Sequence, residues 1–133
     1  MLVAGANSVL AAGHLVIERA WIRSAPPGVM MLAGYATLRN DGDAPVIVTG
    51  AQSAGFGSVS LHESIEQDGV ARMRPLERVE VKPDASVVFA PGGKHLMLMR
   101  PEHELKPGES VKIRLDTSAG GVIADFAMRD VAP

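Results

Sequence analysis

Hydrophobic and polar residues alternate over short stretches of this chain, and clusters of glycine and proline separate the stretches. Alternation with a period of two is typical of strands that bury one face. The stretches recur about every 8 to 12 residues, and no window free of Gly and Pro sustains the helical period of 3.6. The pattern predicts an all-β fold, a Greek-key sandwich or barrel of eight or nine short strands, with any parallel pairing confined to edge strands.

Asp68-Gly69 is the clearest hairpin signal, between the expected strands 58–65 and 70–78. If these two residues form the loop, opposite positions sum to 137, so Ser64 faces Met73 and His62 is its diagonal neighbour. Diagonal neighbours lie about 7 to 8 Å apart at the backbone. The hairpin is therefore expected to present one histidine and one methionine together.

A second pair of the same kind follows the glycine turn at positions 92 and 93, where His95, Met97 and Met99 alternate with leucines. On a strand these three residues share one face, and His95 and Met97 lie about 6.6 Å apart. Imidazole and thioether groups are soft donors that suit Cu(I) better than a hard cation. The sequence thus offers two similar half-sites.

Read together, His62, Met73, His95 and Met97 have the spacing H-x10-M-x21-H-x-M. This spacing resembles the signature of the periplasmic copper chaperones of the PCuAC family, a cupredoxin-like group. The flanking segments are similar as well, and the likeness covers about residues 14 to 131. A four-point spacing with matching flanks is far more specific than a lone H-x-M.

The resemblance implies a surface Cu(I) site made of these four residues on a cupredoxin-like β-sandwich, in a protein that is not an enzyme. It further implies a periplasmic carrier whose partners are copper-accepting or thiol-containing oxidase assembly proteins, for the dinuclear copper centre of cytochrome c oxidase. Two departures from the family pattern weaken the case for a second copper site. Glu63 stands where many members carry Met, and the chain stops at Pro133 where many continue into a tail rich in His and Met.

Composition excludes several other kinds of site and partner. The chain has no cysteine, which excludes disulfides, thiolate metal sites and the blue-copper centre. A net charge of -2 provides no basic field for nucleic acid. No apolar run approaches the roughly 20 residues of a membrane span. With 133 residues, we expect one copper-binding domain over 14–133, preceded by a residual export segment or disordered N-terminus at 1–13.

Two other readings stay open at this point. The histidines and methionines could be incidental in a β-sandwich interaction or assembly module. Alternatively, cleavage after residue 13 would make His14 the mature N-terminus, whose free amine and imidazole chelate Cu(II). For Met30, Met31 and Met99, apolar packing is the default expectation.

Overall fold

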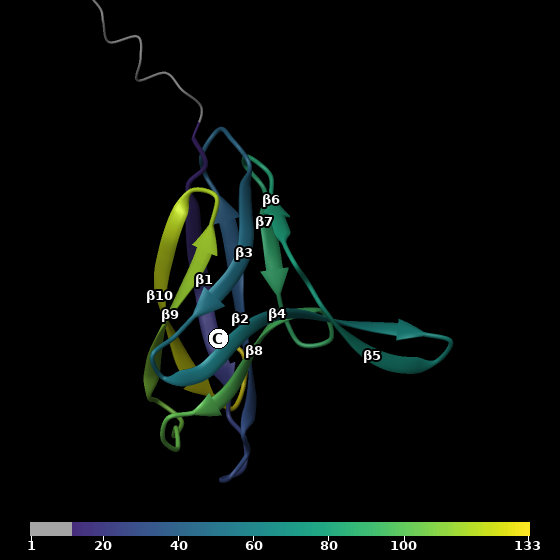
Figure 1. Ribbon diagram of the computed structural model, residues 1–133, viewed down its shortest axis with the longest axis vertical. Helices are drawn as coiled ribbons and strands as arrows, with labels where there is room; N and C mark the ends of the chain where they lie inside the picture. Colours follow the sequence, from purple (N-terminus) through teal and green to yellow (C-terminus); the bar gives the residue numbers. More distant parts are fainter. Residues whose placement is uncertain (1–11) are drawn as a thin grey trace, which may run out of the picture.

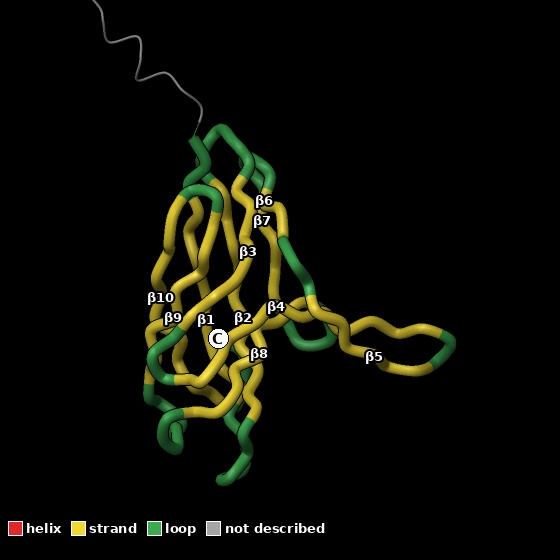
Figure 2. The backbone as a smooth tube through the Cα atoms, in the orientation of Figure 1, coloured by secondary structure: helices red, strands yellow, loops and turns green. Residues whose placement is uncertain are grey.

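The computed structural model describes residues 12–133, and these form strands and loops only (Figures 1 and 2). No helix in this part of the chain is long and apolar enough to cross a membrane. The ten strands are β1 (Leu15–Arg23), β2 (Met31–Asn40), β3 (Val46–Gln52), β4 (Phe56–Gln67), β5 (Val70–Pro75), β6 (Val79–Val81), β7 (Ser86–Phe89), β8 (Lys94–Pro101), β9 (Ser110–Thr117) and β10 (Gly120–Arg129).

Seven strands close into a barrel in the order β4-β8-β2-β1-β10-β9-β3. The ring is completed where Ala51 of β3 pairs with Val59 of β4. Pairing is antiparallel except between β1 and β10, which run parallel. The prediction of an all-β fold is confirmed, although ten strands form where eight or nine were expected. Residues 76–78 leave the sheet after Pro75 because β5 pairs with β4, whereas β6 pairs with β3.

Inward-facing side chains of the barrel strands form one apolar core. Its buried members come from all seven barrel strands, and each large apolar side chain contributes about 1.5 to 3 kcal/mol of burial free energy. This core fixes the register of β4 and β8, because a slip of one residue would expose their leucines. The buried side chains include Ile22, Leu38, Leu61, Leu96, Leu98, Ile113, Leu115 and Phe126.

The β4–β5 hairpin forms an arm that projects from the side of the barrel (Figure 1). Its loop residues Asp68 and Gly69 have φ of 53° and 78°, as a two-residue turn of this hand requires. The predicted register is confirmed, since Ser64 pairs with Met73. Every residue of β5 is exposed, and β5 pairs with β4 alone. The arm therefore carries side chains away from the core while keeping them in register with it.

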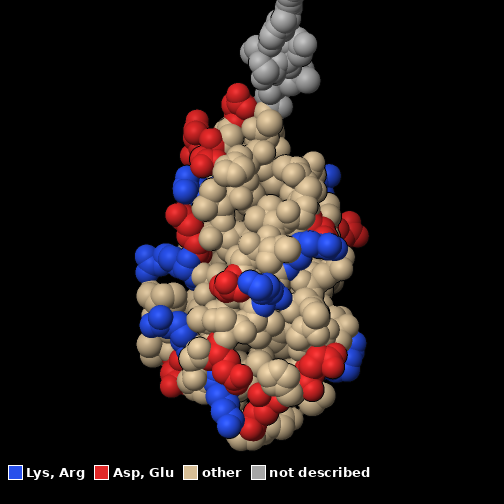
Figure 3. All heavy atoms as spheres, turned by 90° about the vertical axis from the view of Figure 1, so that its left-hand side faces the viewer, with Lys and Arg blue, Asp and Glu red and all other residues tan. Residues whose placement is uncertain are grey.

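The side of the barrel opposite the arm carries charges of both signs (Figure 3). Among them, Lys112 pairs with Asp125 at 3.0 Å and Arg114 with Asp116 at 3.1 Å. Exposed pairs of this kind contribute little to stability. Mixed charges also give this side no strong field of one sign.

Candidate metal centre

The pairing of β4 with β8 brings the two half-sites together. His62 lies directly opposite His95, and Ser60 directly opposite Met97. Residues opposite one another in an antiparallel pair share a face, so both imidazoles and the Met97 thioether lie on one side of the sheet. The two rings are stacked, with centroids 6.0 Å apart and planes inclined by 21°.

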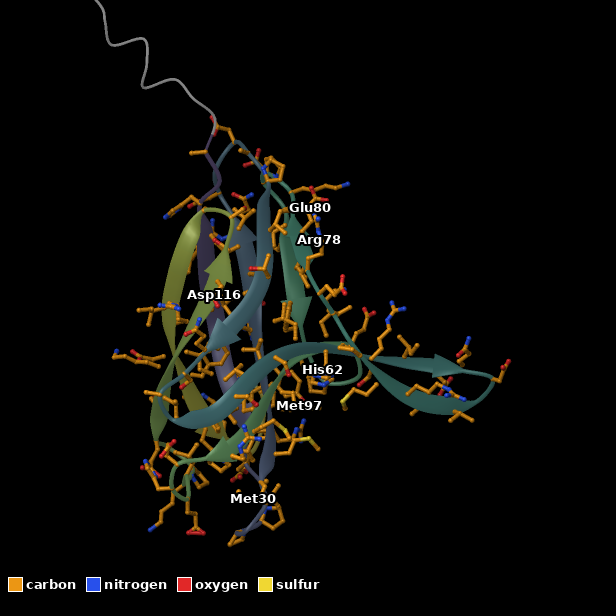
Figure 4. The ribbon with its side chains drawn as sticks, in the orientation of Figure 1. Met30, His62, Arg78, Glu80, Met97 and Asp116 are labelled. Carbon is orange, nitrogen blue, oxygen red and sulfur yellow. The ribbon has the colours of Figure 1, made fainter. Side chains whose placement is uncertain are left out.

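Met73 reaches the same face from the arm. Its partner Ser64 lies two residues beyond His62 on β4, which places Met73 diagonally across from His62. The side chain is 51% exposed. All four residues predicted from the motif therefore lie on one face of β5, β4 and β8, and Figure 4 shows His62 and Met97 as neighbours where the arm leaves the barrel.

The imidazole of His95 is buried, with 5% of the residue exposed. Its Nδ1 lies 3.2 Å from the carbonyl oxygen of Gly93, and a carbonyl can only accept, so Nδ1 carries the proton. The Ser64 amide donates to the same oxygen and holds it in place. In the neutral ring Nε2 then carries a free lone pair, the form in which an imidazole binds a metal.

That Nε2 atom is the one buried side-chain nitrogen or oxygen without a hydrogen-bond partner among residues 12–133. Leaving a buried polar group unpaired costs about 1 to 3 kcal/mol. A soft metal ion on this nitrogen would remove the cost, since it takes up the lone pair directly. The donor groups present thus fit a Cu(I) ion.

Two buried aromatic residues lie on the same outward face of the sheet as His95. Tyr35 follows Gly34, the partner of Leu96, and is therefore next in register to His95. Trp21 packs on Tyr35 with ring centroids 4.9 Å apart, and both residues are buried. The two rings thus form buried apolar surface on the face of the sheet that carries the candidate centre.

His62 is half-buried, and its Nε2 lies 2.9 Å from the hydroxyl oxygen of Ser60. Burial lowers the pKa of His62 below its ordinary value of 6.5, and repulsion between the two rings when both are protonated lowers it further. Both causes disfavour the imidazolium. His62 therefore keeps a neutral, metal-binding ring to lower pH than a free histidine does.

The opposite face of the same strands carries a cluster of ion pairs around Glu63. Glu63 accepts a hydrogen bond from Arg74 at 2.7 Å and lies 3.3 Å from Lys94, one partner on each neighbouring strand. The Arg74 hydrogen bond is the main reason that the pKa of Glu63 falls below its usual value. Because neighbours on a strand alternate in direction, Glu63 points away from His62. It links three strands behind the candidate centre.

Two contributors were missed in the sequence, Ser60 and the Gly93 carbonyl. Ser60 lies two positions before His62 and hence on its face, a signal that the alternation rule contained. The carbonyl gave no signal, because its contact with His95 depends on the turn geometry. The two remaining histidines lie elsewhere: His14 contacts Asp41 at 2.5 Å, and the His103 ring contacts the backbone carbonyl of Glu104. No group of three or more His, Asp or Glu side chains suited to a metal occurs in the described residues.

Comparison with known proteins decides the family. The model described as "LpqE-like: Putative lipoprotein LpqE-like" matches residues 15–125. The chain belongs to the LpqE-like family. A curated relative of this LpqE-like domain, "Putative lipoprotein Lxx21020" of Leifsonia xyli subsp. xyli, is 30% identical over 105 residues. The match covers 78% of the chain but 62% of the relative, so the domain spans less than two thirds of that protein. The lipoprotein designation indicates an extracytoplasmic location.

Solved structures confirm the predicted resemblance to PCuAC domains. The apo PCuAC domain from PmoF1 matches with a TM-score of 0.73 and 27% identity, covering 92% of this chain and 97% of that one. The copper-bound PCuAC domain from PmoF2 gives 0.73 and 28%, covering 93% and 97%. The solution structure of CuI-DR1885 from Deinococcus radiodurans gives 0.68 and 26%, covering 96% and 83%. Membership of a copper-binding family agrees with the prediction that the LpqE-like domain is not an enzyme.

Proposed function

We propose that this LpqE-like domain is a Cu(I) carrier that holds the ion between His62, Met73, His95 and Met97. The observation that supports this most directly is the buried, unpartnered Nε2 of His95, opposite a second imidazole and beside Met97. The copper-bound relatives support the choice of metal.

The donor set explains why such a protein would carry copper rather than use it in catalysis. Two neutral imidazoles and two thioethers are soft ligands, and thioethers neither titrate nor form disulfides in an oxidising compartment. Four protein ligands leave no open position for a substrate. Release then proceeds by ligand exchange, in which an incoming donor replaces one ligand at a time. The exposed Met73 is the ligand that a partner reaches first.

The recipient of the copper is proposed from the resemblance to PCuAC chaperones rather than from the geometry of the site. We propose a periplasmic carrier that delivers Cu(I) to copper-accepting or thiol-containing assembly proteins, for the dinuclear centre of cytochrome c oxidase. A thiolate acceptor is a softer and stronger ligand for Cu(I) than a thioether, so transfer in that direction is favourable. Mixing the Cu(I)-loaded protein with such an acceptor and measuring the copper on each after separation tests this step, and copper that stays on the carrier would contradict it.

The site itself is tested by an anaerobic competition titration of the full chain with a coloured Cu(I) chelator. The unmodified protein is expected to bind one equivalent, and His95→Ala or Met97→Ala is expected to weaken that binding strongly. Met128→Leu serves as the matched control, because Met128 lies in the core. Unchanged binding in alanine variants of all four residues would leave the interaction module as the better reading.

A further inference from the structure

The methionines of this domain are distributed unusually. Met1 lies outside the described residues, and of the six others only Met128 belongs to the core. Met30, Met31 and Met73 are 55%, 49% and 51% exposed, and Met97 and Met99 are half-buried. Met30 and Met31 are therefore not core residues, and only the surface-packing part of the default expectation fits their exposure. An exposed thioether gains little from burial, so another reason for its position is needed.

Two of these methionines form a pair beside the candidate centre. Met31 of β2 lies directly opposite Met99 of β8, and Ala33 lies opposite Met97 in the next row. Met31, Met97 and Met99 consequently share the outward face of the sheet with His95. Met99 is two residues from Met97, about 6.6 Å along the strand. The pair thus continues the row of soft donors beyond the four-residue centre.

The strand neighbours of the pair on β4 and β2 are small side chains. Ser58 and Ser60 of β4 face Met99 and Met97, and Ala33 completes the neighbouring positions. These side chains are too small to cover a thioether. The residues directly opposite Met97 and Met99 on the neighbouring strands are Ala33, Ser58 and Ser60 besides Met31, and none carries a carboxylate, so a monovalent ion would find soft sulfur donors there without a competing acidic ligand.

The pair is also held in position. The Arg100 amide donates a hydrogen bond of 2.8 Å to the Met30 carbonyl, just before β2 begins. Met31 itself lies within the β2–β8 ladder. Directly opposite side chains have Cβ atoms about 4.5 to 5.5 Å apart, and three rotatable bonds allow two thioethers to converge on one ion. Figure 4 shows Met97 between His62 and Met30, which marks the direction of the row.

We propose that Met31 and Met99 form a second, weaker Cu(I) station, from which the ion passes to and from the four-residue centre through Met97. The inference rests on the proposed function, because the station has a purpose only if the centre carries copper. Transfer is a ligand exchange in which one copper–sulfur bond forms as another breaks, without electron or proton transfer. Two thioethers bind more weakly than two thioethers plus two imidazoles, as a transit station requires.

Methyl NMR of the full chain, with 13C-labelled methionine and Ag(I) as a redox-inert soft probe, tests the station directly. The first equivalent is expected to shift the methyl signals of Met73 and Met97, and further Ag(I) those of Met31 and Met99. The control signals are those of Met30, exposed but unpaired, and the core residue Met128. Signals of Met31 and Met99 that stay unmoved, or that move no more than that of Met30, would overturn the inference.

A kinetic experiment tests the role in transfer. Met31→Leu/Met99→Leu conserves volume and is compared with Met30→Leu. In the double variant the affinity for the first Cu(I) is expected to change less than about twofold, while transfer to a chelator slows about fivefold, since a transit site affects rates rather than equilibrium. An unchanged rate, or loss of the first equivalent itself, would overturn the station. Absence of Cu(I) binding in the unmodified protein would instead refute the proposed function.

Discussion

The two strands that flank β4 differ in how firmly they hold their side chains. β8 pairs with β4 on one side and β2 on the other, and buries Leu96 and Leu98 in the core. β5 pairs with β4 alone, and all of its residues are exposed. His95 and Met97 therefore lie on a strand fixed by packing, whereas Met73 lies on an edge strand of a projecting arm.

Because of this difference, the ligands on β8 and the ligand on β5 are expected to have different roles in the proposed centre. Ligands on a packed strand keep their geometry without the ion, so binding orders little and gains affinity. A ligand on an exposed edge strand can move away at small cost, which release to a partner requires. A carrier needs both a preorganised site and a ligand that leaves easily, and variants of β8 and of β5 separate these two properties.

Stability should show the largest contrast. Leu96→Ala on β8 is expected to lower the free energy of unfolding by about 2 to 5 kcal/mol, because it leaves a cavity in the core. Val70→Ala on β5 should change it by less than about 0.5 kcal/mol, since Val70 is 52% exposed. Urea unfolding of the metal-free protein measures both. Similar losses in the two variants would mean that the arm is packed as firmly as the barrel.

Copper affinity should follow the same division. His95→Ala is expected to weaken Cu(I) binding about 100-fold or more, and Met73→Ala about tenfold, because the first removes a preorganised imidazole and the second a compliant thioether. Competition titration under identical conditions gives the ratio. A larger loss in Met73→Ala than in His95→Ala would reverse the assignment of the firm and the adaptable side of the centre.

Glu63 joins the two strands from behind, and its contribution should be small. The side-chain contacts with Arg74 and Lys94 lie at the surface, so Glu63→Gln is expected to cost about 0 to 1 kcal/mol. The pKa of Glu63 is lowered in the folded state, so this contribution exists above the unfolded value near 4.5 and is lost as pH falls below it. Thermal unfolding at pH 7 and pH 3 measures it, and a difference that persists at pH 3 would contradict an ionic origin.

The smallest expected effect is a shift in titration at the junction of β4 and β8. NMR titration of metal-free protein should give His62 a midpoint below 6.5, because burial and the charge of His95 both disfavour its protonation. Folded His62 then binds fewer protons than unfolded, so its effect lowers stability as pH falls through 6.5. In His95→Ala the midpoint should move back towards 6.5. A midpoint at or above 6.5 in the unmodified protein would contradict the described environment.

Local sequence patterns predicted much of the fold. The alternation of residues predicted an all-β chain, and Asp68-Gly69 predicted the register that pairs Ser64 with Met73. The expected strand 70–78 was too long, because the chain changes its pairing partner there: β5 ends at Pro75 on β4, and β6 begins at Val79 on β3. The predicted export segment or disordered N-terminus at 1–13 lies almost entirely outside the described residues 12–133, so it stays a prediction.

By itself, the sequence determined the fold class, the hairpin of the arm and the two His–Met pairs that the proposed centre combines, because strand alternation and turn chemistry act over a few residues. Only the tertiary structure decided that His62 lies opposite His95 and that Met31 lies opposite Met99. These pairs join distant parts of the chain, and their registers are fixed by the burial of leucines on the other face. The same packing leaves Nε2 of His95 buried without a partner, which no local pattern could indicate.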